Sequence, residues 1–236
     1  MKDIYEGASE ILAWLGPEGE KGLLGASKIA GIYQRYVSEW ERLGTPDAAY
    51  QNPRLTLGGS GLSVMAALLD RTWFHRVWIV QEGTVPVRTT FYLCHSTIPA
   101  DAVYTVARLI SALPLQITHS DLFLGTVSGG HIWELAEFAK KRARECEEFS
   151  LLTVLETFRN FEASDPRDKI YAALGFAGDI SNEHPIEIDN PKPHRQILRD
   201  VALTCLYQSP RNLRFLGHAS LRGTEHMPAT WMLDWL

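Results

Sequence analysis

Residues 71–82 carry the densest set of side chains able to do chemistry, with two tryptophans, two arginines and a terminal Gln-Glu pair. On a helix, residues three, four or seven apart share a face, which places Trp78 one turn from Glu82. A carboxylate beside an indole in a partly desolvated pocket has its charged form disfavoured, so Glu82 would suit proton transfer or the holding of sugar hydroxyls. The alternative reading makes the tryptophans core residues and pairs Glu82 with Arg71 or Arg76, and residue types alone favour it.

Other chemical groupings in the sequence have simpler explanations. The glycine-rich run at residues 58–61 could cradle an anion, but a flexible turn explains it better because it lacks the order of a P-loop. Asp165-Pro166-x-Asp168 is the ordinary start of a helix, and His131 with Glu134 has no further ligand to complete a metal set. We therefore predict no metal site and no bound cofactor.

Four segments, in matching order, resemble motifs of the fungal heterokaryon-incompatibility (HET) domain family. The most specific is R-x-W-F-x-R-V-W-x-x-Q-E at residues 71–82. The others are I-Y-x-x-A-x-x-I-x-A-W-L-G at residues 4–16, D-P-R-D-K-I-Y-A-A-L-G at 165–175 and M-P-A-T-W-M-L-D-W at 227–235. The family's opening S-Y-x-W-G and A-I-C-I-N-Q motifs do not precede Met1, so we expect an N-terminally truncated member of the family.

The resemblance implies a role in fungal self/non-self recognition and programmed cell death. It also implies a TIR-like parallel sheet and, by analogy with TIR relatives that cleave NAD through a glutamate, Glu82 as the catalytic residue. The substrate-binding residues that follow from it are Trp78, Trp14, Arg76 and Gln81, with NAD as a possible substrate. The alternative is a non-catalytic interaction or regulatory module, or an inactive fragment, acting through an unknown protein partner or self-association.

Composition limits the class of partner and compartment. The chain of 236 residues has a formal net charge of −5, which supplies no positive field to collect nucleic acid. Its three cysteines form no CxxC pair, and no apolar run approaches the ~20 residues that span a bilayer. We expect a cytoplasmic protein with neither nucleic acid nor a membrane span.

The elements that must position these residues follow from hydrophobic periodicity. Residues 11–15 and 87–93 read as strands, residues 23–43 as an amphipathic helix and residues 44–61 as a long loop, while 62–82 reads as helical with a break near Thr72. Beyond residue 98 the pattern is helical over 99–113, 132–146, 151–161, 167–174 and 195–207, with a loop near 125–130 and possible strands at 213–216 and 230–233. We predict an α/β class protein in which residues 1–96 form the later part of a HET domain and 97–236 a helical extension.

Overall fold

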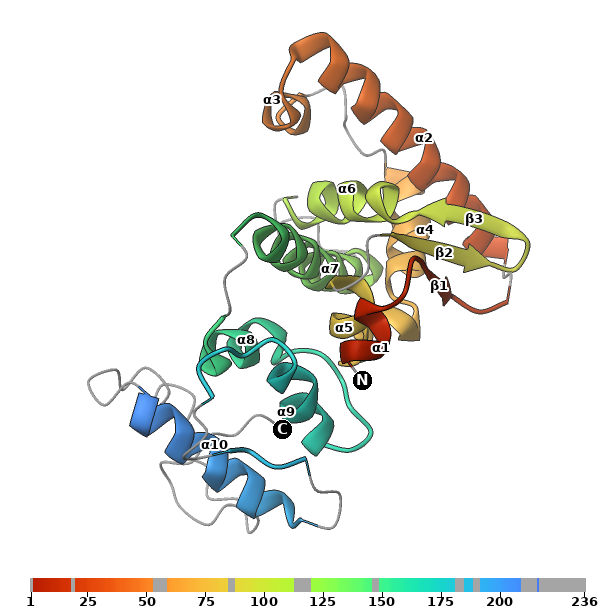
Figure 1. Ribbon diagram of the computed structural model, residues 1–236. Helices are drawn as coiled ribbons and strands as arrows, with labels where there is room; N and C mark the ends of the chain where they lie inside the picture. The colour runs from red at the N-terminus through yellow and green to blue at the C-terminus, as the bar shows by residue number, and fades with distance from the viewer. Residues whose placement is uncertain are drawn as a thin grey trace. The chain divides into compact units, whose positions relative to one another are not determined.

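A computed structural model describes residues 2–17, 20–52, 59–84, 88–112, 120–145, 149–180, 185–188, 192–208 and 216. The chain forms two compact units, Met1–Ala143 and Arg144–Leu236. The first contains a small sheet with helices against it (Figure 1). The class is therefore α/β, as predicted, whereas the division at residues 96 and 97 and the TIR-like character of the fold stay predictions.

The first unit has a three-stranded mixed sheet in the order β1-β2-β3. Strand β1 (Ile11–Trp14) pairs in parallel with β2 (Thr89–Leu93), which pairs in antiparallel with β3 (Ser96–Pro99). The predicted sheet was wholly parallel, and this is wrong for β3. Only two residues join β2 to β3, and a connection that short forces the strands to run antiparallel.

The two faces of this sheet differ sharply. Strand β2 alternates buried and half-buried residues, as the sequence predicted, and Phe91 lies in register with buried Ala13 and buried Ile98 on one face. On the other face, the side chains of Leu12 and Trp14 are 62% and 56% exposed. Successive strand residues point to opposite sides, so the sheet has one core face and one open face.

The helices of the first unit pack against the sheet and against one another. Helices α2 and α6 contact β2 and β3, and α4 packs along α2 (Figure 1). The elements of this unit are α1 (Lys2–Glu6), α2 (Glu20–Leu43), α3 (Pro46–Tyr50), α4 (Gly59–Leu69), the 3₁₀ helix η2 (Thr72–His75), α5 (Ile79–Thr84), α6 (Ala100–Ser111) and most of α7 (Ser120–Glu145).

The predicted helices at 23–43 and 99–113 are confirmed, and that at 62–82 breaks after Leu69. Two predicted loops are wrong. Helix α3 begins within the first, where Thr45 caps it by accepting from the Ala48 amide and a proline occupies the first turn. Helix α7 continues through the second, and its Gly129 packs close to α6: a Cβ there would lie 3.2 Å from the Ala107 carbonyl oxygen.

The second unit contains α8 (Leu151–Phe158), α9 (Arg167–Leu174) and α10 (His194–Gln208), which confirms the three helices predicted there. An isolated bridge joins Phe149 to Ala177. The predicted strands at 213–216 and 230–233 lie outside the described residues, apart from residue 216. Among the described residues, no helix is both long enough and apolar enough to cross a bilayer.

Candidate functional site

Arg71, the first residue of the dense motif, anchors the turn that follows β1. Its Nη1 donates to the carbonyl oxygens of Leu15 at 2.9 Å and Pro17 at 3.1 Å. Gly16 between them has φ +98, a left-handed conformation that suits glycine. A Cβ on Gly16 would lie 3.1 Å from the same guanidinium nitrogen, so the two motifs at 4–16 and 71–82 fit together as one structural unit.

The aromatic residues after Arg71 form part of the core. Trp73 and Phe74 are buried in η2, and the Trp73 ring meets the Phe91 ring edge-on with centroids 4.9 Å apart. Phe74 lies 5.3 Å from Phe91 by the same measure. These contacts fix η2 on the core face of the sheet and agree with the core interpretation for Trp73.

Glu82 accepts a hydrogen bond on each carboxylate oxygen. The Trp73 indole Nε1 donates to Oε2 at 3.0 Å, and the Tyr5 hydroxyl donates to Oε1 at 3.4 Å. Burial raises the pKa of Tyr5, and the neighbouring Glu82 carboxylate raises it further while Arg76 opposes the rise. We call Tyr5, Trp73 and Glu82 the carboxylate cluster; it ties α1, η2 and α5 together.

The predicted helical arrangement of residues 71–82 is wrong in one respect. The backbone of Arg76 is extended, with φ −72 and ψ 133, so the chain turns between η2 and α5. Residues on the two sides of Arg76 therefore do not share the faces that one continuous helix would give them. Trp73 reaches Glu82 because of this turn, although nine residues separate them. Trp78 lies one turn before Glu82 as predicted, with its carbonyl oxygen accepting from the Glu82 amide at 3.3 Å.

The other predicted substrate-binding residues spread over different surroundings. Gln81 is buried with 2% exposure, Trp78 is half-buried and Arg76 is exposed. Trp14 lies in register with Tyr92 on the open face, whereas Trp73 packs on Phe91 on the core face. The sheet therefore separates Trp14 from the indole that holds Glu82.

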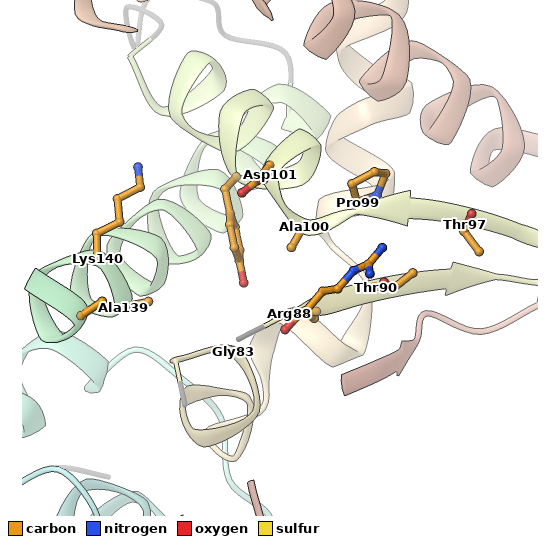
Figure 2. Close-up of a pocket in the computed structure, with 12 residues that line it drawn as sticks. Gly83, Arg88, Thr90, Thr97, Pro99, Ala100, Asp101, Ala139 and Lys140 are labelled. Carbon is orange, nitrogen blue, oxygen red and sulfur yellow. The ribbon is translucent and has the colours of Figure 1, made fainter. Parts of the chain in front are cut away.

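A hollow of about 540 Å³ opens in the first unit beside α5, within the usual range of small-molecule sites. Figure 2 shows Arg88 and Thr90 on the β2 side, Lys140 on α7 across from them, and Asp101 at the start of α6. Glu82 does not line this hollow, but its neighbour Gly83 does. Sequence reasoning missed the hollow because its walls come from five separate segments.

The lining also includes Tyr104 of α6, whose hydroxyl is buried and has no hydrogen-bond partner in the part of the chain that is described. A Cβ on Gly83 would lie 3.5 Å from this hydroxyl. Burial raises the pKa of Tyr104, and the Asp101 carboxylate adds to the rise, so the phenol stays protonated and can donate. Its O–H group is therefore available to donate a hydrogen bond to a ligand.

The turn predicted at residues 58–61 is wrong from Gly59 onward, where α4 begins, whereas Asp165 agrees with its simpler explanation. Asp165 accepts from the Arg167 amide at 3.0 Å and from its guanidinium, which opens α9 as an ordinary helix start. The guanidinium bonds, then the amide, lower the pKa of Asp165 to about 2. Among the described residues, no three or more metal-ligating side chains come together, near His131 or elsewhere.

Comparison with known proteins identifies the first part of the chain. Residues 1–82 match the family model "Heterokaryon incompatibility protein (HET)". The whole chain aligns with "Heterokaryon incompatibility protein 6, OR allele" of Neurospora crassa at 24% identity, and it spans 41% of the length of that relative. No solved structure matches the chain at a significant level.

Proposed function

We propose that this chain, whose residues 1–82 belong to the heterokaryon incompatibility (HET) family, acts in fungal self/non-self recognition and the cell death that follows it. The match places the Arg71–Glu82 motif at the end of the family segment, and a Neurospora relative is named for incompatibility. The finer proposal is that Glu82 serves hydrolysis of NAD at the bond between nicotinamide and ribose.

The observation that supports a chemical role is the orientation of Glu82. Its carboxylate is only half-buried, and two donors, the Trp73 indole and the Tyr5 hydroxyl, hold its oxygens from η2 and α1. Cleavage of the nicotinamide–ribose bond leaves an oxocarbenium-like cation, which a fixed carboxylate beside it can stabilise. Positioning by two hydrogen bonds removes the cost of orienting the carboxylate during the reaction.

Nicotinamide release from NAD by the purified chain tests this activity. We expect Glu82→Gln to lower the rate by about 100-fold or more, since it removes the charge that faces the cation. Glu41→Gln is the matched control, because Glu41 is an exposed glutamate on α2. Equal release by all three proteins would exclude Glu82 as the catalytic residue.

The second candidate is a non-catalytic interaction module, and two observations favour it. Both Glu82 oxygens already accept hydrogen bonds within the fold, and Leu12 and Trp14 expose apolar surface on the open sheet face. Expression of the chain in a filamentous fungus, with cell death scored by dye uptake, separates the candidates. The enzyme predicts that Glu82→Gln abolishes death, whereas the module predicts that Trp14→Ser abolishes it and Glu82→Gln does not.

A further inference from the structure

The hollow beside α5 is shaped by small side chains. Gly83, Ala100, Ala139 and Ala143 line it on three sides, and none of them carries atoms beyond Cβ. A Cβ on Gly83 would lie 3.5 Å from the hydroxyl of Tyr104, which also lines the hollow. The hollow is thus a property of several separate segments of the chain.

Its polar groups point to a ligand that carries both a negative charge and hydroxyl groups. Arg88, just before β2, and Lys140 from α7 supply positive charge on opposite sides (Figure 2). Asp101 supplies an acceptor, and the Tyr104 and Thr97 hydroxyls line the same space. An anion alone would satisfy the two cations, whereas a ligand that also carries hydroxyl groups could donate to the Asp101 carboxylate.

Arg88 and Lys140 each form an ion pair within the fold, and both pairs are weak enough for a ligand to displace. Arg88 Nε lies 3.7 Å from Glu10 Oε1, and the Arg88 side chain is 76% exposed. Lys140 Nζ lies 3.2 Å from Glu137 Oε1, with both side chains about half exposed, and 4.9 Å from the centre of the Trp133 ring. Exposed ion pairs contribute little to stability, so an incoming phosphate can replace them at small cost.

We propose that this hollow binds a sugar phosphate, free or as part of a nucleotide, with Arg88 and Lys140 on the phosphate and Asp101 and Tyr104 on the sugar hydroxyls. The buried Tyr104 hydroxyl carries the argument, because a buried donor without a partner costs free energy unless a ligand or water takes its hydrogen bond. This site stands apart from the proposed role of Glu82, which does not line the hollow.

Calorimetric titration of the purified chain with ribose 5-phosphate tests the site, beside adenosine monophosphate, ribose and inorganic phosphate. We expect saturable binding of ribose 5-phosphate and weaker binding of ribose or phosphate alone. Arg88→Gln should weaken binding about tenfold, as loss of a charge-assisted hydrogen bond does, and Tyr104→Phe about fivefold. Arg35→Gln removes the same charge from an exposed position on α2 and should bind like the wild type.

The comparison of ligands and variants decides the outcome. Tighter binding of adenosine monophosphate than of ribose 5-phosphate would assign the site to nucleotides, and the reverse order to free sugar phosphates. The proposal is overturned if no ligand binds, if phosphate alone binds as well as ribose 5-phosphate, or if Arg88→Gln and Arg35→Gln bind alike. Lys140→Gln, with Lys28→Gln as its control, supplies the same comparison should Arg88→Gln fail to fold.

Discussion

Replacement of Trp73 by phenylalanine tests whether the carboxylate cluster holds the first unit together. The change keeps an aromatic ring against Phe91 but removes the Nε1 donor that lies 3.0 Å from Glu82 Oε2. A hydrogen bond to a charged group contributes roughly 1.5–3 kcal/mol, and partial exposure favours the lower end of that range. With a further loss of about 0.5 kcal/mol from the smaller ring, we expect a total of about 2 kcal/mol.

A double-mutant cycle with Glu82→Met isolates the hydrogen bond from the packing. In the Glu82→Met background, Trp73→Phe should cost only about 0.5 kcal/mol, which leaves a coupling of about 1.5 kcal/mol between the two side chains. Tyr5→Phe should couple to Glu82 more weakly, because its hydrogen bond is 3.4 Å long.

Urea unfolding, followed by hydrogen exchange of the backbone amides in peptides that cover β2 and β3, measures these changes in unfolding free energy for the first unit alone. With a typical slope of about 2 kcal/mol per molar urea, Trp73→Phe should lower the midpoint by about 1 M. A cost that is the same in both Glu82 backgrounds would refute the claim that this carboxylate is bound to the indole.

Three further changes test the turns and the second unit. Gly16→Ala should destabilise the first unit by about 1–2 kcal/mol in thermal melting, since φ is +98 there and the Cβ meets the Arg71 guanidinium. Cys94→Gly should stabilise it by about 0.5 kcal/mol, because Cys94 has φ 49 in the turn between β2 and β3, and an unchanged melting temperature would argue against strain. Asp165 has a lowered folded-state pKa, so its contribution is complete above pH ~4 and is lost as the pH falls toward 2; Asp165→Asn should flatten that acid limb in denaturation of the second unit.

Hydrophobic periodicity predicted the helices and strands that are determined by residues close together in the sequence. The strand at β1, the alternation along β2 and the helices α2 and α9 follow from spacing and from local signals such as the Asp165-Pro166 start. Strand β3 has only four residues, ends in a proline and has a single buried position, Ile98, so it shows too little alternation to be recognised. Its register comes from pairing with β2 across a two-residue turn.

The candidate site was harder to predict because it depends on contacts between distant segments. Glu82 was identified from its motif, but its partner Tyr5 lies 77 residues away and Trp73 reaches it only through the turn at Arg76. Hydrophobic spacing carries no information about such a turn, because it assumes that the helix continues. The Tyr104 hydroxyl was missed for a related reason: its unusual property is a missing partner, which only the folded chain reveals.

The last two residues of the dense motif and the glycine that follows them lie in three different surroundings. Gln81 is 2% exposed in the core, Glu82 accepts from Trp73 and Tyr5, and Gly83 lines the hollow. Successive helical residues are about 100° apart around the axis, so three in a row cannot share one site. The motif therefore does not form a single pocket. Helix α5 connects the carboxylate cluster to the hollow. A ligand in the hollow that packs against Gly83 would therefore contact the residue directly after Glu82.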